Sequence, residues 1–259
     1  MERKDFLKKV ALAGVSVSML AGRAIEQGTP VKCDETSEGE EGPFPTKAPS
    51  SLPSKSIVLD RAGTPLTISI FVNNINDKCN ALKGAIVDLW HCDHLGEYSE
   101  YGRGLGDGKD FPMPPPANQD RKEFKDDRNR QGPPSMGGGG MQEANNTNEH
   151  FLRGRQTTNA NGVASFTSIF PGWYPGRAPH IHAHIYDKNE KSLLICQIAF
   201  PDDVSKEVHG QGVYKDHEQA DTSNISDHVF NDSIANELAI VTGNPKDGYL
   251  LTHSIYVKA

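Results

Sequence analysis

The chain has few hydrophobic residues and no long apolar run. Residues of the types Ala, Val, Ile, Leu, Met, Phe, Trp, Tyr and Cys make up 36% of the 259 residues, which is below the usual share in globular domains. The one sustained apolar run, residues 10–21, is about a dozen residues long, whereas a transmembrane helix needs roughly 20. The sequence therefore predicts no transmembrane anchor. At this length it favours one large domain with long loops.

A basic stripe is also lacking. Lys and Arg number 27 against 34 Asp and Glu, which gives a formal net charge of −7. Proteins that follow the phosphates of a nucleic acid carry basic residues clustered on one face or along one segment. We therefore expect no nucleic-acid partner.

The N-terminal residues have the pattern of an export signal. Basic residues precede the apolar run, and Gly22 and Ala24 supply small residues at positions −3 and −1 of a cleavage after Ala24. The stretch RKDFLKK is similar to a twin-arginine signal with Lys4 in place of the second arginine, which leaves the export route open. We predict that residues 1–24 are an export signal and that the mature protein is periplasmic or extracellular. An ordinary amphipathic N-terminal helix is the alternative.

Cysteine is scarce. The four cysteines are Cys33, Cys79, Cys92 and Cys196, and in an oxidising compartment four cysteines can pair in three ways. Cys79 and Cys92 lie near the two ends of one candidate strand and its lead-in, so a Cys79–Cys92 disulfide is our prediction. Reduced, buried cysteines are the alternative.

Strand patterns dominate from residue 56 onward. TISIFVNN places Ile68, Ile70 and Val72 on one face, and AIVDLWHCD is mostly apolar. GVASFTSIF alternates after a NANG turn, and HIHAHIYD, LLICQIAF and YLLTHSIYV follow it. No long stretch has a helical period, although NDSIANELAI fits a short helix. The sequence predicts an all-β fold over residues 56–259, a β-sandwich of mixed or antiparallel strands with long loops.

Two polar segments lie outside this strand pattern. Residues 25–55 are rich in Gly, Pro and Ser and are interpreted as an N-terminal arm. Residues 102–150 are dominated by Gly, Pro, Asn and charge, and they cannot bury enough apolar area to fold alone. Because this segment is far longer than a typical connection, we predict one large Gly/Pro-rich loop inserted between two strands of the same domain. A linker between two domains is the alternative, and the role of the insertion is open.

Three histidines recur at every second position in PGWYPGRAPHIHAHI. Side chains alternate along a strand, so His180, His182 and His184 project from one face. Two imidazoles two residues apart can converge on one metal ion, whereas three such positions span roughly 13 Å and do not easily converge. Tyr174 precedes them in a turn-rich segment and offers a phenolate, which suits trivalent iron better than zinc or copper. Packed histidines and a tyrosine corner are the alternatives.

Four stretches together resemble one enzyme family. EGPFP, GAIVDLWHCDHLGEYS, FLRGRQTTNANGVASFTSIFPGWYPGRAPHIHAHI and ICQIAFPDD are similar to the catalytic domain of the intradiol ring-cleavage dioxygenases, the family of protocatechuate 3,4-dioxygenase and catechol 1,2-dioxygenase. The similarity is greatest to the exported, single-chain bacterial members. It covers roughly residues 38–101 and 149–230.

The resemblance implies a non-haem ferric ion, Fe(3+), as the cofactor. Tyr98 lies eight residues after Trp90, which is the spacing between the pocket tryptophan of the family and its first tyrosine ligand. Tyr101 is a rival that lacks this spacing. Tyr174 would be the ligand that leaves when the substrate binds. The implied iron ligands are Tyr98, Tyr174, His180 and His182.

The resemblance also implies a reaction. A catecholic ring would be cleaved by O2 between its two hydroxylated carbons to give a cis,cis-muconate-type diacid. Trp90, Arg177 and Gln197 would lie beside the substrate, Arg177 would stabilise developing negative charge, and Tyr174 would accept a substrate proton. The expected partners are a small-molecule catechol and O2, with a homo-oligomer left open. Two other functions stay open: a catalytically silent binding module of the same fold, and a zinc hydrolase built on the histidine strand.

Overall fold

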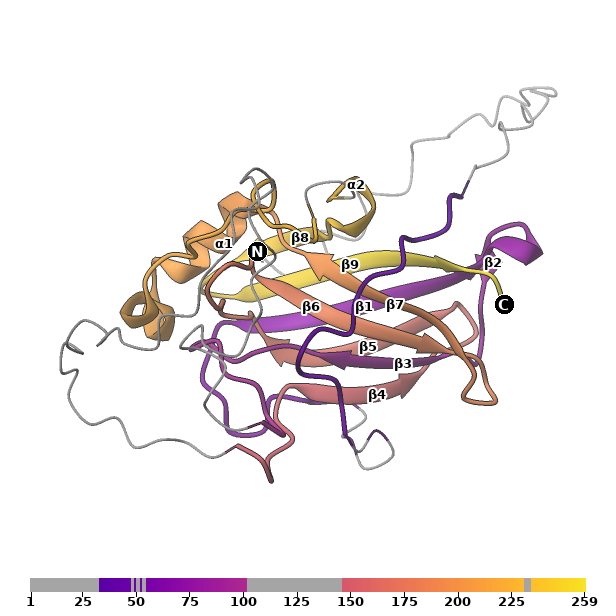
Figure 1. The fold of residues 1–259 in the computed structure, drawn as a ribbon, viewed down its shortest axis with the longest axis horizontal. Coiled ribbons are helices and arrows are strands. Elements are labelled where there is room, and N and C mark those ends of the chain that lie inside the picture. The colour runs from indigo at the N-terminus through magenta and orange to yellow at the C-terminus, as the bar shows by residue number, and fades with distance from the viewer. Residues whose placement is uncertain (1–32, 48, 50–51, 53–54, 102–145, 231–233) are drawn as a thin grey trace, which may run out of the picture. The chain divides into compact units, whose positions relative to one another are not determined.

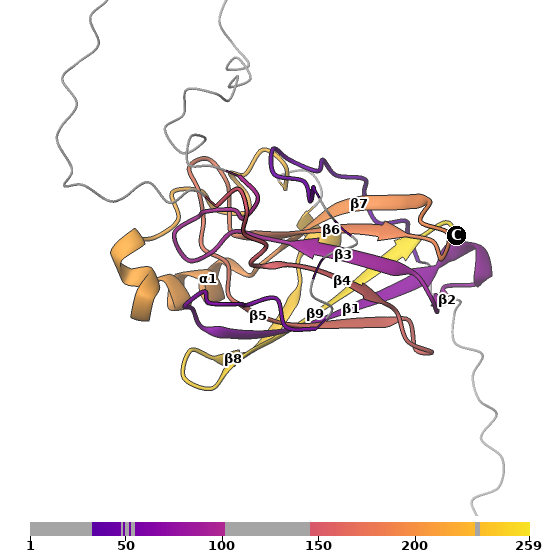
Figure 2. The same ribbon diagram turned by 90° about the horizontal axis from the view of Figure 1, so that it is seen from below.

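Two β-sheets lie as two layers (Figures 1 and 2). This computed structural model describes residues 33–47, 49, 52, 55–101, 146–230 and 234–259, and they all belong to one compact unit, Cys33–Ala259. Sheet A contains β1 (Pro65–Asn74), β2 (Asn80–Ala81), β5 (Val163–Ile169), β8 (Ile240–Asn244) and β9 (Gly248–Val257). Sheet B contains β4 (Arg153–Thr157), β3 (Ile86–Trp90), β6 (His180–Tyr186) and β7 (Ser192–Ala199), in that order across the sheet.

The central strand of sheet A is β1. It pairs in parallel with β9 and antiparallel with β5 and β2, while β8 pairs antiparallel with β9. Ile68, Ile70 and Val72 are fully buried and alternate with more exposed positions. The predicted all-β sandwich with mixed strands is therefore confirmed, and so is the predicted buried face of this strand.

Sheet B is antiparallel throughout, and its inner face completes the core. Leu89 of β3 and Ile181, Ala183 and Ile185 of β6 belong to the apolar cluster between the sheets. Because neighbouring side chains alternate, the three histidines of β6 lie on the outer face. This outer face is buried as well, so it must have a cover of its own.

The helices are short. α1 (Asp202–His209) and the 3₁₀-helix η3 (Gly212–His217) follow β7, η2 (Ile75–Asp77) follows β1, and α2 (Ile234–Glu237) precedes β8. α2 falls within the stretch predicted to form a short helix, whereas α1 is too short to show a helical period in the sequence. None of the helices in the described part of the chain has the length and apolar character that a bilayer crossing requires.

Residues 33–47 of the N-terminal arm run beside β7 and contact the end of β9. The backbone N–H of Gly39 donates to the carbonyl of Ile195 at 2.8 Å, and that of Thr36 donates to the carbonyl of Tyr256 at 3.1 Å. In Figure 1 this arm is the indigo segment that passes in front of β6 and β7. The arm is therefore part of the cover over sheet B.

The predicted Cys79–Cys92 disulfide is wrong. Cys79 pairs with Cys33 of the arm, with a Cα–Cα distance of 6.3 Å, and Cys92 and Cys196 are free and buried. The physical reason is the course of β3, which rises about 3.3 Å per residue and so carries Cys92 away from the β1–β2 turn that holds Cys79. The arm brings Cys33 to that turn instead.

Several predictions fall outside the described residues. These are the export signal at residues 1–24, the first part of the arm at 25–32, and residues 102–145 of the predicted insertion. The domain boundaries at residues 24, 55 and 56 stay predictions.

Candidate active site

The histidines His180 and His182 bring their Nε2 atoms together on the outer face of β6. Nδ1–H of His180 donates to the carbonyl of Ala178 at 2.6 Å, so Nε2 of this ring carries the lone pair. That Nε2 atom lies 3.2 Å from Nε2 of His182 and 3.2 Å from the hydroxyl of Tyr174. Three atoms of the kind that bind metals therefore converge.

Tyr174 reaches the histidines because two loops pack backbone against backbone. The N–H of Gly172 donates to the carbonyl of Asp93 at 3.0 Å. Gly96 has a φ of +80°, and a side chain there would collide with the carbonyl of Trp173. The glycines of PGWYPG and HLGEYS thus allow the turn before β6 to lie against the turn after β3.

Tyr98 comes from that second turn and faces the same point. Its ring centroid lies 5.9 Å from that of Tyr174 and 6.3 Å from that of His182, and its buried hydroxyl has no hydrogen-bond partner. The hydroxyl of Tyr101, by contrast, donates to the carbonyl of Pro45 at 2.7 Å. The geometry therefore brings Tyr98, and not Tyr101, to the histidines.

Three predicted residues form a row across sheet B. Trp90 of β3 pairs with His182 of β6, which pairs in turn with Gln197 of β7. The Trp90 ring stacks on the His182 imidazole at 5.0 Å and 4° and is 1% exposed. Trp90 thus supports the histidine, and its contact with a substrate stays a prediction.

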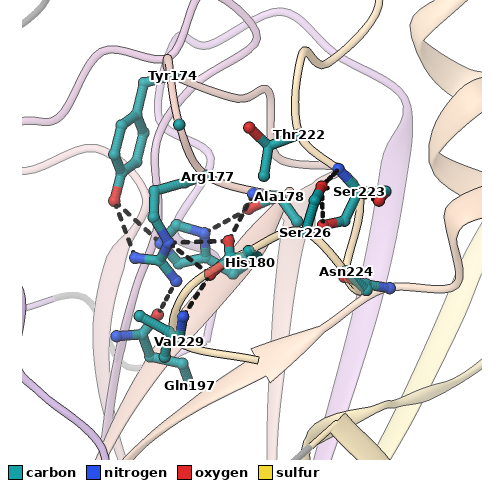
Figure 3. A network of polar contacts seen from close by, with 12 residues as sticks. Tyr174, Arg177, Ala178, His180, Gln197, Thr222, Ser223, Asn224, Ser226 and Val229 are labelled. Atoms are coloured by element: carbon teal, nitrogen blue, oxygen red, sulfur yellow. Dashed lines mark hydrogen bonds and ion pairs between the residues drawn. The ribbon is translucent and has the colours of Figure 1, made fainter. Parts of the chain in front are cut away.

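Arg177 and Gln197 lie beside Tyr174 and His180 (Figure 3). Nη2 of Arg177 donates to Oε1 of Gln197 at 2.5 Å, and Nη1 lies 3.5 Å from the hydroxyl of Tyr174. Nε2 of Gln197 donates to the carbonyl of Glu40 in the arm at 3.1 Å. A fixed positive charge therefore borders the group of tyrosines and histidines.

The arm closes the site from the other side. Phe44 stacks on Tyr98 with centroids 4.3 Å apart. Gly42 has a φ of +68°, and a Cβ atom on it would lie 3.0 Å from Cε1 of His182. Arg153, fully buried, donates to the carbonyls of Phe44 and Ser99 at 3.0 and 2.9 Å. The arm motif EGPFP thus forms a wall of the site. Sequence reasoning had singled out this motif without giving its residues a role.

Burial shifts every titratable member of the group toward its neutral form. It raises the pKa of Tyr98 well above its usual range and that of Tyr174 to about 12. Burial, with Arg177 nearby, lowers the pKa of His180 and His182 well below the usual range. A bound cation would favour the phenolate forms of the two tyrosines here. Two imidazole nitrogens and two phenol oxygens are a donor set that fits a ferric ion.

A zinc site on three histidines has no support. Nε2 of His184 lies 2.8 Å from Oγ of Ser192, and Nδ1 lies 2.8 Å from the hydroxyl of Tyr186. Across the residues that the structure describes, no group of three or more His, Cys, Asp or Glu side chains is arranged to hold a metal ion. His184 is a hydrogen-bonded neighbour of the site.

Asp227 is a buried residue of the site that sequence reasoning missed. Its carboxylate accepts from Nε of Arg177 at 2.9 Å and is 0% exposed. It follows a polar stretch without strand or helix periodicity, so the pattern around it gave no signal.

The chain is similar in structure to ring-cleaving dioxygenases. An intradiol ring-cleavage dioxygenase from Tetranychus urticae matches with a TM-score of 0.64 and 27% identity, over 87% of this chain and 95% of that chain. The dioxygenase domain of a dioxygenase carbohydrate-binding protein fusion from Streptomyces sp. SirexAA-E matches with a TM-score of 0.53 and 23% identity, over 87% and 99%. At that identity the second match shows the fold alone. No protein-family model matches the sequence, and no curated protein matches it.

Proposed function

Because this chain belongs to the intradiol ring-cleavage dioxygenase family, we propose that it cleaves a catecholic ring between the two hydroxylated carbons. O2 would be the co-substrate, ferric iron the cofactor and a cis,cis-muconate-type diacid the product. The observation that carries this proposal is the convergence of the Tyr174 hydroxyl and the Nε2 atoms of His180 and His182 beside the unpartnered Tyr98 hydroxyl.

Four side chains would hold the iron: Tyr98, Tyr174, His180 and His182. When bound, a ferric ion supplies a Lewis acid that favours the catechol dianion and activates the ring toward O2. Trp90 and the Ala178 carbonyl would keep the two imidazoles in the orientation that presents Nε2.

Tyr174 would accept a catechol proton at its hydroxyl oxygen. Burial raises the pKa of this phenol to about 12, so its oxygen favours the protonated form whenever no cation is bound to it. Arg177, whose Nη1 is 3.5 Å from the same oxygen, would stabilise negative charge that develops on the substrate. Phe44 and Gly42 of the arm would exclude water from that side.

Oxygen uptake tests the proposal. The iron-loaded protein should consume one O2 per ring opened with at least one of catechol, protocatechuate, hydroxyquinol and chlorocatechols, and mass spectrometry should find both oxygen atoms in the diacid. Iron without turnover on this panel would favour a silent binding module. A protein that takes up no iron from iron-replete medium would refute the proposal.

We also propose that the protein is exported. The N-terminal signal pattern supports this, and so does the Cys33–Cys79 disulfide, because disulfides persist in oxidising compartments. The test is the N-terminal sequence of protein recovered from the periplasm or medium. Full-length protein found only in the cytoplasm would contradict export.

A further inference from the structure

Asp227 carries a buried charge to which the proposed reaction gives no role. It is 0% exposed and lies in the segment between η3 and α2. Its Oδ1 and Oδ2 accept from Nε of Arg177 at 3.1 and 2.9 Å. Taking an ion pair out of water is costly unless each charge is fully hydrogen-bonded, so the remaining contacts of this carboxylate decide what it does.

The carboxylate of Asp227 is fixed by backbone donors. Oδ2 accepts from the N–H of Ala178 at 2.7 Å, and Oδ1 accepts from the N–H of Val229 at 2.8 Å. The N–H of Asp227 itself donates to the carbonyl of Ser223 at 2.9 Å. With Arg177 included, both oxygens are satisfied, and neither is left to bind a ligand.

The loop that carries Asp227 is tied to sheet B. Nδ2 of Asn224 donates to the carbonyl of Phe200, directly after β7, at 2.7 Å, and the N–H of Asn224 donates to Asp202 of α1 at 3.1 Å. Figure 3 shows Val229 near the Arg177 side chain, with Ser223 and Asn224 farther away in the same loop. The loop is therefore anchored at the end of the same strand that carries Gln197.

The contacts of Arg177 divide between two edges of its guanidinium. Nε faces Asp227, whereas Nη2 donates to Gln197 and Nη1 lies beside the Tyr174 hydroxyl. The guanidinium is planar and its donors form a rigid fork, so the ion pair between Nε and Asp227 fixes the direction of both Nη groups. The positive edge of Arg177 then faces the site.

We propose that Asp227 is a positioning residue for the ring-cleavage reaction. It holds Arg177 so that its Nη edge faces the substrate, and it balances the buried cation. Only the predicted effect of Asp227 on turnover rests on the proposed function; its grip on the Arg177 side chain does not. It assigns Asp227 no contact with substrate or iron.

A double-mutant cycle tests this role. Asp227→Asn should lower kcat/KM at least about tenfold while iron content and visible absorption stay as in the parent. In an Arg177→Gln background the same change should have less than a twofold effect, because the residue through which Asp227 acts is gone. Equal factors in both backgrounds would overturn the proposal. Asp216→Asn is the matched control, since it removes the same charge from an exposed position in η3, shortly before this loop.

A second variant keeps the test decisive if Asp227→Asn fails to fold. Asp227→Glu keeps the charge and moves the carboxylate by one methylene. It should fold, bind iron and lose at least about fivefold in kcat/KM. A folded Asp227→Glu protein with parental kcat/KM would contradict a positioning role.

The NMR signal of the Arg177 Nε–H provides a readout that does not need turnover. In the full-length protein treated with chelator, this signal is identified by its absence in Arg177→Lys. It should exchange slowly with solvent in the parent and in Asp216→Asn, and rapidly in Asp227→Asn or Asp227→Glu. If the parent cleaves no catechol, the proposed function fails while this experiment still decides about Asp227. Slow exchange in all variants would refute the inference.

Discussion

β1 and β6 both turn apolar side chains toward the core, but they differ on the opposite face. In β1 that face is partly or fully exposed and carries Thr67 and Phe71. In β6 it is buried and carries His180, His182 and His184. Burying polar groups costs free energy unless they are paired, so a buried row of histidines points to a role other than stability.

The cover over β6 is made of chain segments that contribute little to the main core. The arm and the turns after β3 and before β6 lie over the outer face, and Arg153 ties the arm to the Tyr98 turn. β1 has its outer face open instead. The outer face at β1 is thus open to solvent, whereas the outer face at β6 is covered and encloses the candidate site.

The largest effect is expected from adjacent residues on opposite faces of β6. His182→Ala should abolish iron binding and lower turnover at least about a thousandfold, with the fold retained, because a proposed iron ligand is removed. Ile181→Ala should cost about 3 kcal/mol of stability through the cavity it leaves, with normal iron per folded chain. Elemental analysis, oxygen uptake and urea unfolding check both. Loss of iron in the Ile181 variant alone would reverse our assignment of the faces.

The two tyrosines of the GEYSEY turn allow a residue that faces the site to be compared with a neighbour that does not. Tyr98→Phe should lower turnover by about a hundredfold or more and change the visible absorption, because it removes a phenolate donor. Tyr101→Phe removes only the hydrogen bond to the Pro45 carbonyl, worth about 1 kcal/mol, and should keep turnover within about twofold. The opposite order would mean that Tyr101 is the ligand.

A buried histidine of sheet A should make the stability of the fold depend on pH, independently of iron. Burial lowers the pKa of His253 on β9 to about 4, below the ordinary value of about 6.5. Between these values the unfolded chain binds a proton that the folded chain does not, so stability is complete above pH 6.5 and falls as pH drops toward 4. The loss is up to ~3 kcal/mol. In urea unfolding at pH 7 and 4.5, His253→Phe should lose less stability than the parent, and an equal loss would contradict the prediction.

The smallest effect is expected at two glycines with positive φ. Gly42→Ala and Gly84→Ala should each cost roughly 1 kcal/mol through backbone strain, because φ is +68° and +82°. A Cβ on Gly84 meets nothing within 4 Å, whereas one on Gly42 meets His182. Only Gly42→Ala should lower kcat/KM, by a few-fold. Equal kinetics in both variants would mean that the arm does not constrain the histidine.

The strands could be predicted from local sequence, because the apolar side chains on one face of a strand recur at every second residue, as Ile68, Ile70 and Val72 do. The grouping of Tyr98 with His182 required a family resemblance, since no local pattern links residues so far apart in the chain. Asp227 was missed because a single buried ion pair leaves no periodicity. The partner of Cys79 was predicted wrongly because it depends on the path of the arm.

The central claim is that the covered face of sheet B holds a ferric ion through two tyrosines and two histidines. Resonance Raman spectroscopy, with excitation in the visible charge-transfer band of the purified protein, tests it most directly. The account predicts tyrosinate modes from two distinct residues, one set lost in Tyr98→Phe and the other in Tyr174→Phe. Iron-loaded protein without tyrosinate modes, or with modes unchanged in both variants, would contradict it.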